Sequence, residues 1–149
     1  MAGRRGGRRG PRRQCAALAF AEQGGEVRVL LVTSRETRRW VLPKGWTEKG
    51  LSGYELAAKE AYEEAGVVGQ ASPDPVGQYG YLKRLSKGRS VECDVLVFPV
   101  RVERLLDDWP ERGQRTRQWF TLAQAAMAVD EGDLAILLTR LAAPTATRG

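Results

Sequence analysis

The chain contains no histidine, only two cysteines and no apolar run approaching the length of a membrane-spanning helix. Without histidine, Ser-His-Asp and Cys-His catalytic groups and His-ligated zinc sites are excluded. A transmembrane helix needs about 20 apolar residues, so no segment is expected to cross a membrane. Cys15 and Cys93 fall within expected strands, where cysteine is usually a small buried residue, and neither is assigned a role.

The formal charge of +6 is concentrated at one end of the chain. Residues 1–13 hold six arginines and no acid, which leaves equal numbers of basic and acidic residues in the remainder. A Gly/Arg-rich segment has little to bury, so we predict a disordered tail over 1–11, one folded domain over 12–142 and a flexible C-terminus over 143–149. The tail offers sites for RNA or another polyanion, but a dispensable extension is the favoured interpretation.

Glu60, Glu63 and Glu64 are spaced i, i+3 and i+4, so a helix would project all three carboxylates from one face. Like charges at this spacing repel each other, and their retention predicts a cation on that face. Oxygen ligands on a rigid element suit Mg²⁺ or Mn²⁺, which commonly act on phosphates. A solvated acidic face is the alternative for the isolated pattern, so the flanking residues decide between the two.

Those flanking residues specify a helix. Ser52 and Glu55 have the spacing of a capping box, and Gly66 is suited to the left-handed position that ends a helix. Upstream, residues 40–46 are expected to form a short buried strand that breaks at Pro43 and turns at Gly45. The order is strand, glycine loop, capped helix and glycine stop.

The rest of the chain alternates strand and helix patterns. We expect strands at 76–85, 91–102 and 119–120, a helix capped by Thr121, and a last helix over 134–141. Along the second of these strands, the side chains expected to face the core are those of Val91, Cys93, Val95 and Val97. This order predicts an α/β fold, an α/β/α sandwich with a mixed β-sheet between helices.

The run from Gly45 to Val67 resembles the Nudix box, whose pattern is G-x5-E-x7-R-E-U-x-E-E-x-G-U with U aliphatic. The matching positions after Gly45 are Glu60, Ala61, Glu63, Glu64, Gly66 and Val67. Leu51 stands where the pattern has its first Glu, and Lys59 stands where it has Arg. In the family these two side chains pair and brace the loop against the helix, so the sequence predicts that this brace is lost while the carboxylates remain.

The resemblance extends over residues 12–142. Segments 15–20 and 27–35 are similar to the opening hairpin of the Nudix family. Segments 39–46, 106–109 and 115–120 are similar to the branch that hydrolyses diphosphoinositol polyphosphates and diadenosine polyphosphates, in a bacterial-looking form. The resemblance implies the Nudix-type sandwich and metal-dependent hydrolysis of a pyrophosphate linkage, with Mg²⁺ or Mn²⁺ as the cofactor.

The resemblance also implies roles for individual residues. Glu60 and Glu64 are expected to be the principal metal ligands, with Glu63 as a further ligand or an activator of water. Gly45 is expected to offer a backbone carbonyl to the metal. Glu60, Glu63 and Glu64 together are the predicted catalytic residues, and the general base among them is left open. Asp108 and Glu111 lie on a later loop that could approach, although solvated loop acids are the simpler interpretation.

Cations are expected to bind the phosphates of the substrate. Lys44 precedes Gly45, so its ammonium would lie beside the metal as a point charge. The arginines that flank the same pocket in the resembling branch correspond here to Arg35, Arg39, Arg89, Arg115 and Arg117. The aromatic side chains available to stack on an adenine are Tyr79, Tyr81 and Trp46, with packing in the core as the favoured alternative.

Three hypotheses follow from the sequence. The first is a cytoplasmic hydrolase of diadenosine or diphosphoinositol polyphosphates, with a phosphorylated small molecule as its partner. The second is removal of the 5′ pyrophosphate from RNA, aided by the arginine tail. The third is a ligand-binding module on a Nudix scaffold with a decayed active site. The specific polyphosphate and the oligomeric state are not specified by any pattern in the chain.

Overall fold

The computed structural model describes residues 10–143. Its centre is an eight-stranded sheet that contains the path β4-β3-β2-β8-β6. These strands are β4 (Trp40–Val41), β3 (Glu26–Thr33), β2 (Arg12–Gln23), β8 (Ser90–Leu105) and β6 (Val67–Ala71). Three more strands pair beside this path: β5 (Lys44–Trp46) with β2, β7 (Gly77–Arg84) with β8, and β9 (Arg117–Thr121) with β3. β2 and β8 run parallel, whereas their other partners are antiparallel, so the sheet is mixed.

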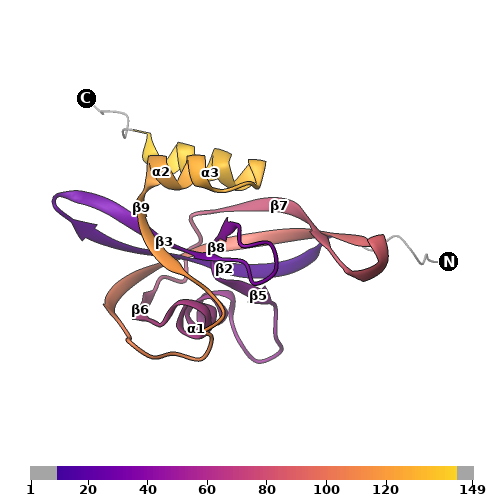
Figure 1. Cartoon of the computed structure of the whole chain (residues 1–149), viewed down its shortest axis with the longest axis horizontal. Coiled ribbons are helices and arrows are strands. Elements are labelled where there is room, and N and C mark those ends of the chain that lie inside the picture. Colours follow the sequence, from indigo (N-terminus) through magenta and orange to yellow (C-terminus); the bar gives the residue numbers. More distant parts are fainter. Residues whose placement is uncertain (1–9, 144–149) are drawn as a thin grey trace.

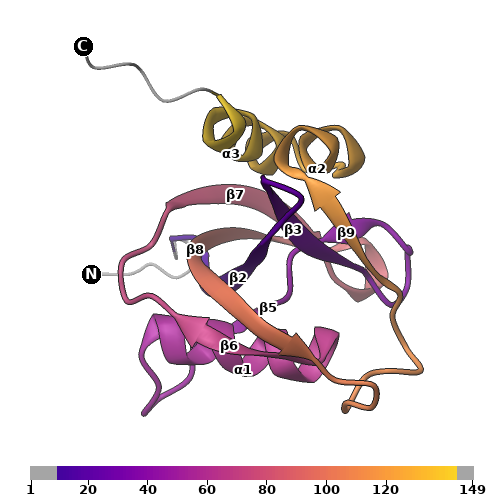
Figure 2. The same ribbon diagram turned by 90° about the vertical axis from the view of Figure 1, so that its left-hand side faces the viewer.

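Helices cover both faces of the sheet (Figures 1 and 2). Helix α1 (Gly53–Ala65) lies on one face, and α2 (Leu122–Ala128) and α3 (Gly132–Ala142) lie together on the other. The predicted α/β/α sandwich is therefore confirmed. Within residues 10–143 no helix has both the length and the apolar character needed to cross a membrane. Most of the two predicted tails, residues 1–9 and 144–149, lies outside the described residues.

Strand β8 separates two hydrophobic cores. Val95 and Val97 belong to the core beneath α2 and α3, whereas Phe98 and Val100 belong to the core beneath α1. The predicted core face is buried at Cys93, Val95 and Val97 and half-buried at Val91. The opposite face is also packed, because a sheet covered by helices on both sides buries both sets of alternating side chains.

The caps of α1 are those expected from the sequence. The Ser52 hydroxyl accepts a hydrogen bond from the Glu55 backbone N–H, and the Glu55 carboxylate accepts one from the Ser52 N–H at 2.9 Å. Gly66 has φ +68° and donates its N–H to the carbonyls of Ala61 and Tyr62. These local contacts set where the acidic helix begins and ends.

Two local predictions differ from the structure. Gly45 does not form a turn, because it lies within β5 opposite Cys15 of β2. The expected break at Pro43 is confirmed, because Pro43 has no N–H to donate to a strand pair and β4 and β5 on either side pair with different strands. Strand β6 after Gly66 was also not predicted. The short β5 brings Gly45 against α1.

Candidate active site

A pair of carboxyl groups forms the centre of the site. Glu60 and Glu64 project from the same face of α1, and their carboxyl groups lie close enough to shift each other's pKa. The Glu64 side chain is only 8% exposed. Burial raises the pKa of Glu64 to about 8, the nearby Arg115 opposes this rise, and the Glu60 carboxyl adds to it. Burial also raises the pKa of Glu60. Ionising both of two neighbouring carboxyl groups is unfavourable unless a cation binds between them.

Gly45 lies directly against this pair. A Cβ atom added to Gly45 would be 2.5 Å from Glu60 Oε2 and 2.6 Å from Glu60 Cδ. The absence of a side chain therefore lets the backbone of β5 approach the Glu60 carboxylate. The structure thus brings together Gly45, Glu60 and Glu64, as the sequence predicted for a metal site.

Gly45→Ala is expected to lower kcat/KM by about 10- to 100-fold, because a displacement of roughly 1 Å in a catalytic group has effects of this size. The thermal midpoint should change little, since the clashing atoms are at the end of a flexible side chain. Steady-state hydrolysis and thermal unfolding would measure the two effects. Gly113→Ala is the matched control, because an added Cβ there meets no atom within 4 Å. Equal activity in the two variants would contradict the prediction.

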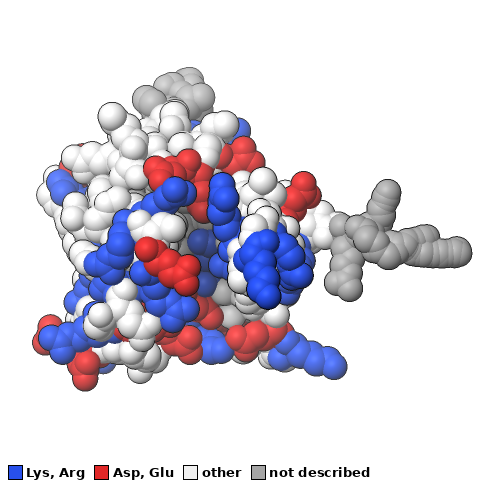
Figure 3. Space-filling view, turned by 45° about the vertical axis from the view of Figure 1, so that its right-hand side comes forward, with Lys and Arg blue, Asp and Glu red and all other residues white. Residues whose placement is uncertain are grey.

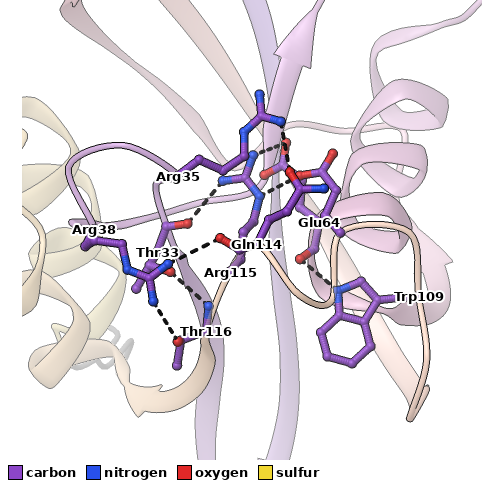
Figure 4. Close-up of polar contacts among 9 residues, drawn as sticks. Thr33, Arg35, Arg38, Glu64, Trp109, Gln114, Arg115 and Thr116 are labelled. Atoms are coloured by element: carbon purple, nitrogen blue, oxygen red, sulfur yellow. Dashed lines mark hydrogen bonds and ion pairs between the residues drawn. The ribbon is translucent and has the colours of Figure 1, made fainter.

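Arg115 holds the carboxylates from the side opposite the helix (Figure 4). Its Nε donates to Glu111 Oε1 at 2.7 Å, its Nη1 donates to the Thr33 carbonyl at 3.1 Å, and its Nη2 lies 3.8 Å from Glu64 Oε2. The side chain is 10% exposed. A buried guanidinium with these partners positions the acidic groups, so its contacts are explained without a substrate.

The later loop contributes one acid to the site. The Glu111 N–H donates to the Glu63 carbonyl at 3.0 Å, which fixes the loop against α1. Glu111 adds negative charge beside Glu60. Asp108, by contrast, pairs with Arg112 at 3.8 Å and its side chain is 89% exposed. Of the two loop acids considered from the sequence, Glu111 is the one beside the carboxylate pair.

The acidic groups fit a divalent cation without enclosing one. Among residues 10–143, no three acidic or cysteine side chains converge into a complete metal cage. Glu60 and Glu64 supply two hard oxygen donors in contact, Gly45 places its backbone beside them, and Glu63 and Glu111 lie at the edge. An open set of oxygen donors suits Mg²⁺ or Mn²⁺, which commonly keep several ligands from water and substrate.

Arg117 was expected to bind substrate, but its guanidinium binds backbone carbonyls instead. Its Nη1 donates to the Ala65 carbonyl and its Nη2 to the Leu106 carbonyl, both at 2.8 Å. The guanidinium also lies over the Trp109 ring, 3.9 Å from its centroid, and Trp109 Nε1 donates to the Glu64 carbonyl at 3.1 Å. These groups satisfy carbonyls at the end of α1 that the helix leaves without partners. We therefore remove Arg117 from the candidate substrate contacts.

The remaining candidate cations differ in position. Arg35 donates to Gln114 Oε1 at 3.0 Å, close to the Arg115 group in Figure 4. Arg39 pairs with Asp130 at 3.1 Å and is 61% exposed. Arg89 is exposed in the β7–β8 hairpin, and no hydrogen bond or ion pair described for residues 10–143 links its side chain to the site. The face seen in Figure 3 has acidic side chains between the basic ones, so it is not a uniform basic patch.

Lys44 adjoins the carboxylate pair. Burial lowers the pKa of Lys44, and the Glu131 and Glu64 carboxylates oppose that effect. Its Nζ lies over the Tyr81 ring, 5.0 Å from the centroid. The charges of Lys44 and Glu64 interact, and the role of Lys44 as a phosphate-binding cation stays a prediction.

One arginine contact near the site was not predicted from the sequence. Arg38 has φ +57° and donates to the Gln114 carbonyl at 3.3 Å and to Thr116 Oγ1 at 3.4 Å. It joins the loop after β3 to the segment that carries Arg115 (Figure 4). A positive φ at arginine leaves no signal in one sequence, so only the structure identifies this contact.

The predicted loss of the brace was wrong in part. Lys59 Nζ lies 2.8 Å from Glu48 Oε2, so the lysine pairs with an acid three positions before Leu51. Both side chains are substantially exposed, and exposed ion pairs of this kind contribute little to stability. The loop is therefore still joined to α1, by a different acid from the one in the family pattern.

A family model described as the NUDIX domain matches residues 10–140, and the chain belongs to this family. The family predicted from the box is thereby confirmed. Nudix hydrolase 17, mitochondrial, of Arabidopsis thaliana is 35% identical over 123 residues, covering 80% of this chain and 65% of that protein. Diphosphoinositol polyphosphate phosphohydrolase 2 of Rattus norvegicus is 31% identical over 121 residues, covering 79% of this chain and 63% of that protein. The chain thus spans less than two thirds of the length of these relatives.

Solved structures share the fold at lower identity. A binary complex of the Ap4A hydrolase of C. elegans has a TM-score of 0.65 at 19% identity and covers 87% of this chain and 94% of that one. The NUDIX domain of Shewanella oneidensis NrtR, solved with ADP ribose, has a TM-score of 0.64 at 15% identity and covers 89% and 88%. At these identities the likeness extends to the fold alone.

Proposed function

We propose that this chain is a divalent-metal-dependent hydrolase of a pyrophosphate linkage in a nucleoside or inositol polyphosphate. The observation that carries the proposal is the pair of the half-buried Glu60 and the buried Glu64 on one face of α1, with Glu60 placed against Gly45. Two neighbouring acids whose pKa values are both raised suit a site that receives a cation.

The proposed ligands of Mg²⁺ or Mn²⁺ are Glu60 and Glu64, with the Gly45 carbonyl and Glu63 completing the set. When bound, the ion supplies Lewis-acid chemistry that neutralises phosphate charge. Arg115 positions Glu64 and Glu111 for hydrolysis, and Glu111 is a candidate to orient the attacking water. The general base stays open between Glu63 and Glu111.

Lys44 is the proposed phosphate contact nearest the carboxyl pair, since it is half-buried, directly precedes Gly45, and its charge interacts with that of Glu64. Arg35 and Arg39 extend from the loop after β3 and are proposed to bind more distant phosphates. The retained pair of Lys59 with Glu48 supports an intact loop and argues against the decayed module.

The names of the relatives supply the substrate classes to test. The rat relative is named for diphosphoinositol polyphosphates, and a structural neighbour is named for Ap4A. The predicted cytoplasmic location stays a prediction, because several relatives are named as mitochondrial or chloroplastic.

A substrate panel tests the proposal. The purified chain would be assayed with Mg²⁺ or Mn²⁺ on diadenosine tetraphosphate, a diphosphoinositol polyphosphate, ADP-ribose and 5′-triphosphorylated RNA. We expect metal-dependent hydrolysis of at least one of the first two, abolished by EDTA. Preferred hydrolysis of the RNA would favour the 5′-pyrophosphohydrolase instead. If no substrate of the panel were hydrolysed with either metal, the ligand-binding module would be the remaining hypothesis.

A further inference from the structure

The segment between β8 and β9 binds the carbonyls at the end of α1. A helix leaves its last backbone carbonyls without partners inside the helix. Here the carbonyls of four consecutive residues accept hydrogen bonds of 2.8–3.1 Å from this segment or from the start of β9. The acceptors Glu63, Glu64, Ala65 and Gly66 receive them, in that order, from the Glu111 N–H, Trp109 Nε1, Arg117 Nη1 and the Leu106 N–H. We call these eight residues the helix–loop junction.

Trp109 lies at the centre of the helix–loop junction. Its indole N–H donates to the Glu64 carbonyl at 3.1 Å (Figure 4), and the Arg117 guanidinium lies over its ring, 3.9 Å from the centroid. Gly66 leaves room for both groups, because a Cβ there would be 2.8 Å from Arg117 Nη1 and 2.8 Å from Trp109 Cδ2. The indole is therefore fixed by a hydrogen bond at its edge and a cation on its face.

A tight turn connects Trp109 with Glu111. The Arg112 N–H donates to the Trp109 carbonyl at 3.1 Å, which closes a turn with Pro110 at its second position. Proline fixes its own φ and is favoured at that position of a turn. The Gln114 N–H then donates to the Glu111 carbonyl at 2.9 Å. Because these bonds make the turn rigid, the position of Trp109 sets the position of Glu111.

The same loop returns to the side chain of Glu64. Glu111 Oε1 accepts from Arg115 Nε at 2.7 Å, and Arg115 Nη2 lies 3.8 Å from Glu64 Oε2. Glu64 is thus contacted at its backbone carbonyl by Trp109 and at its carboxylate by Arg115, and Glu111 lies between these two residues in the chain. The Glu111 side chain is 22% exposed, whereas that of Glu64 is 8% exposed, so water can reach the loop acid.

We propose that Trp109 is a positioning residue of the active site, which fixes Glu111 beside Glu64 and acts on hydrolysis through Glu111. The proposal rests on the proposed function, because Glu111 takes part in the same reaction. Trp109 touches neither metal nor substrate in this scheme. Its indole N–H sets where the loop meets α1, and the loop acid then faces the carboxylates of the helix.

A double-mutant cycle tests this route. Trp109→Phe keeps a ring for Arg117 but removes the N–H that binds Glu64. We expect kcat to fall about tenfold with KM within about twofold of wild type, because small displacements of groups at the reaction centre cost activity of this order. Glu111→Gln should lower kcat by itself while keeping an oxygen for Arg115. In that background Trp109→Phe should change kcat by less than about twofold, since residues that act through one another are not additive.

Trp119→Phe is the matched control, because it removes the same atoms from a half-buried tryptophan that lies on β9 outside the helix–loop junction. Its kcat should stay within about twofold of wild type, even where packing loss lowers the thermal midpoint. An equal loss of kcat from Trp109→Phe in both backgrounds would overturn the proposal. So would wild-type kcat in either single variant, Trp109→Phe or Glu111→Gln.

Hydrogen exchange of the Glu111 amide gives a measurement that needs no catalysis. This amide is protected by the Glu63 carbonyl, so its exchange in the metal-free protein reports how firmly the loop is held on α1. Trp109→Phe should speed the exchange about tenfold, whereas Trp119→Phe should leave it unchanged. Unchanged exchange in Trp109→Phe would overturn the positioning by Trp109. If the wild type were inert across the substrate panel, the proposed function would fail, and the exchange rates would still decide whether Trp109 fixes Glu111.

Discussion

Glu64→Gln is expected to lower kcat/KM for pyrophosphate hydrolysis by roughly 10³-fold while raising the thermal midpoint of the metal-free protein. A metal ligand contributes several kcal/mol to charge stabilisation, and each 1.4 kcal/mol or so is a factor of ten in rate. The opposite effect on stability follows from burial, because Glu64 is 8% exposed and its pKa is raised to about 8 although Arg115 lies 3.8 Å away, and Arg115 keeps Glu111 as its closer partner. An amide in its place removes the cost of a buried acidic pair.

Steady-state kinetics with Mg²⁺ and thermal unfolding in EDTA would measure these two effects. A stabilisation of 1 kcal/mol corresponds to about 2–4 °C at this chain length. Glu92→Gln is the matched control, because Glu92 is exposed on β8 and should leave both quantities unchanged. Activity near that of wild type, or a lower thermal midpoint in EDTA, would contradict the assignment of Glu64 as a buried metal ligand.

Arg115→Met is expected to destabilise the fold by about 3–5 kcal/mol, the usual cost of removing one partner from a buried ion pair. The guanidinium contacts the Thr33 carbonyl and the carboxylates of Glu111 and Glu64. Its loss leaves all three groups without this partner. At this chain length the thermal midpoint should fall by roughly 10 °C. Activity should fall as well, because Glu64 and Glu111 lose the group that positions them.

Arg112→Met provides the comparison on the same loop. Arg112 is 61% exposed and lies 3.8 Å from an exposed Asp108, so its replacement should change stability by about 0.5 kcal/mol or less. Chemical denaturation of both variants would give the free energies of unfolding. If Arg115→Met instead raised KM with unchanged stability, Arg115 would be a substrate contact, as the sequence alone suggested.

The most reliable sequence predictions concern local structure. The ends of α1 are set by the capping box of Ser52 and Glu55 and by the left-handed Gly66. These signals involve residues only a few positions apart, so they could be predicted without knowledge of the fold. Thr121 predicted the start of α2 in the same way. Gly45 was misassigned to a turn because its strand geometry depends on pairing with β2, far away in the chain.

The partners of the arginines could not be predicted from the sequence. Arg115 and Arg117 are two residues apart and were given the same role, yet one holds the acidic pair and the other binds carbonyls at the end of α1. Which partner each finds depends on where the loop after β8 meets the helix. Glu48 replaced the expected acid of the brace for the same reason, since a loop can bring a side chain three positions away to Lys59.

The sequence by itself determined the family, the capped helix and the carboxylates on its face, because these depend on spacing within one element. Only the tertiary structure decided that Glu60 lies against Gly45 and that Arg115 supports Glu64 and Glu111. Those relations connect α1 with β5 and the later loop. Long-range contacts of this kind arise when packing closes the sandwich, and no local pattern in the chain specifies them.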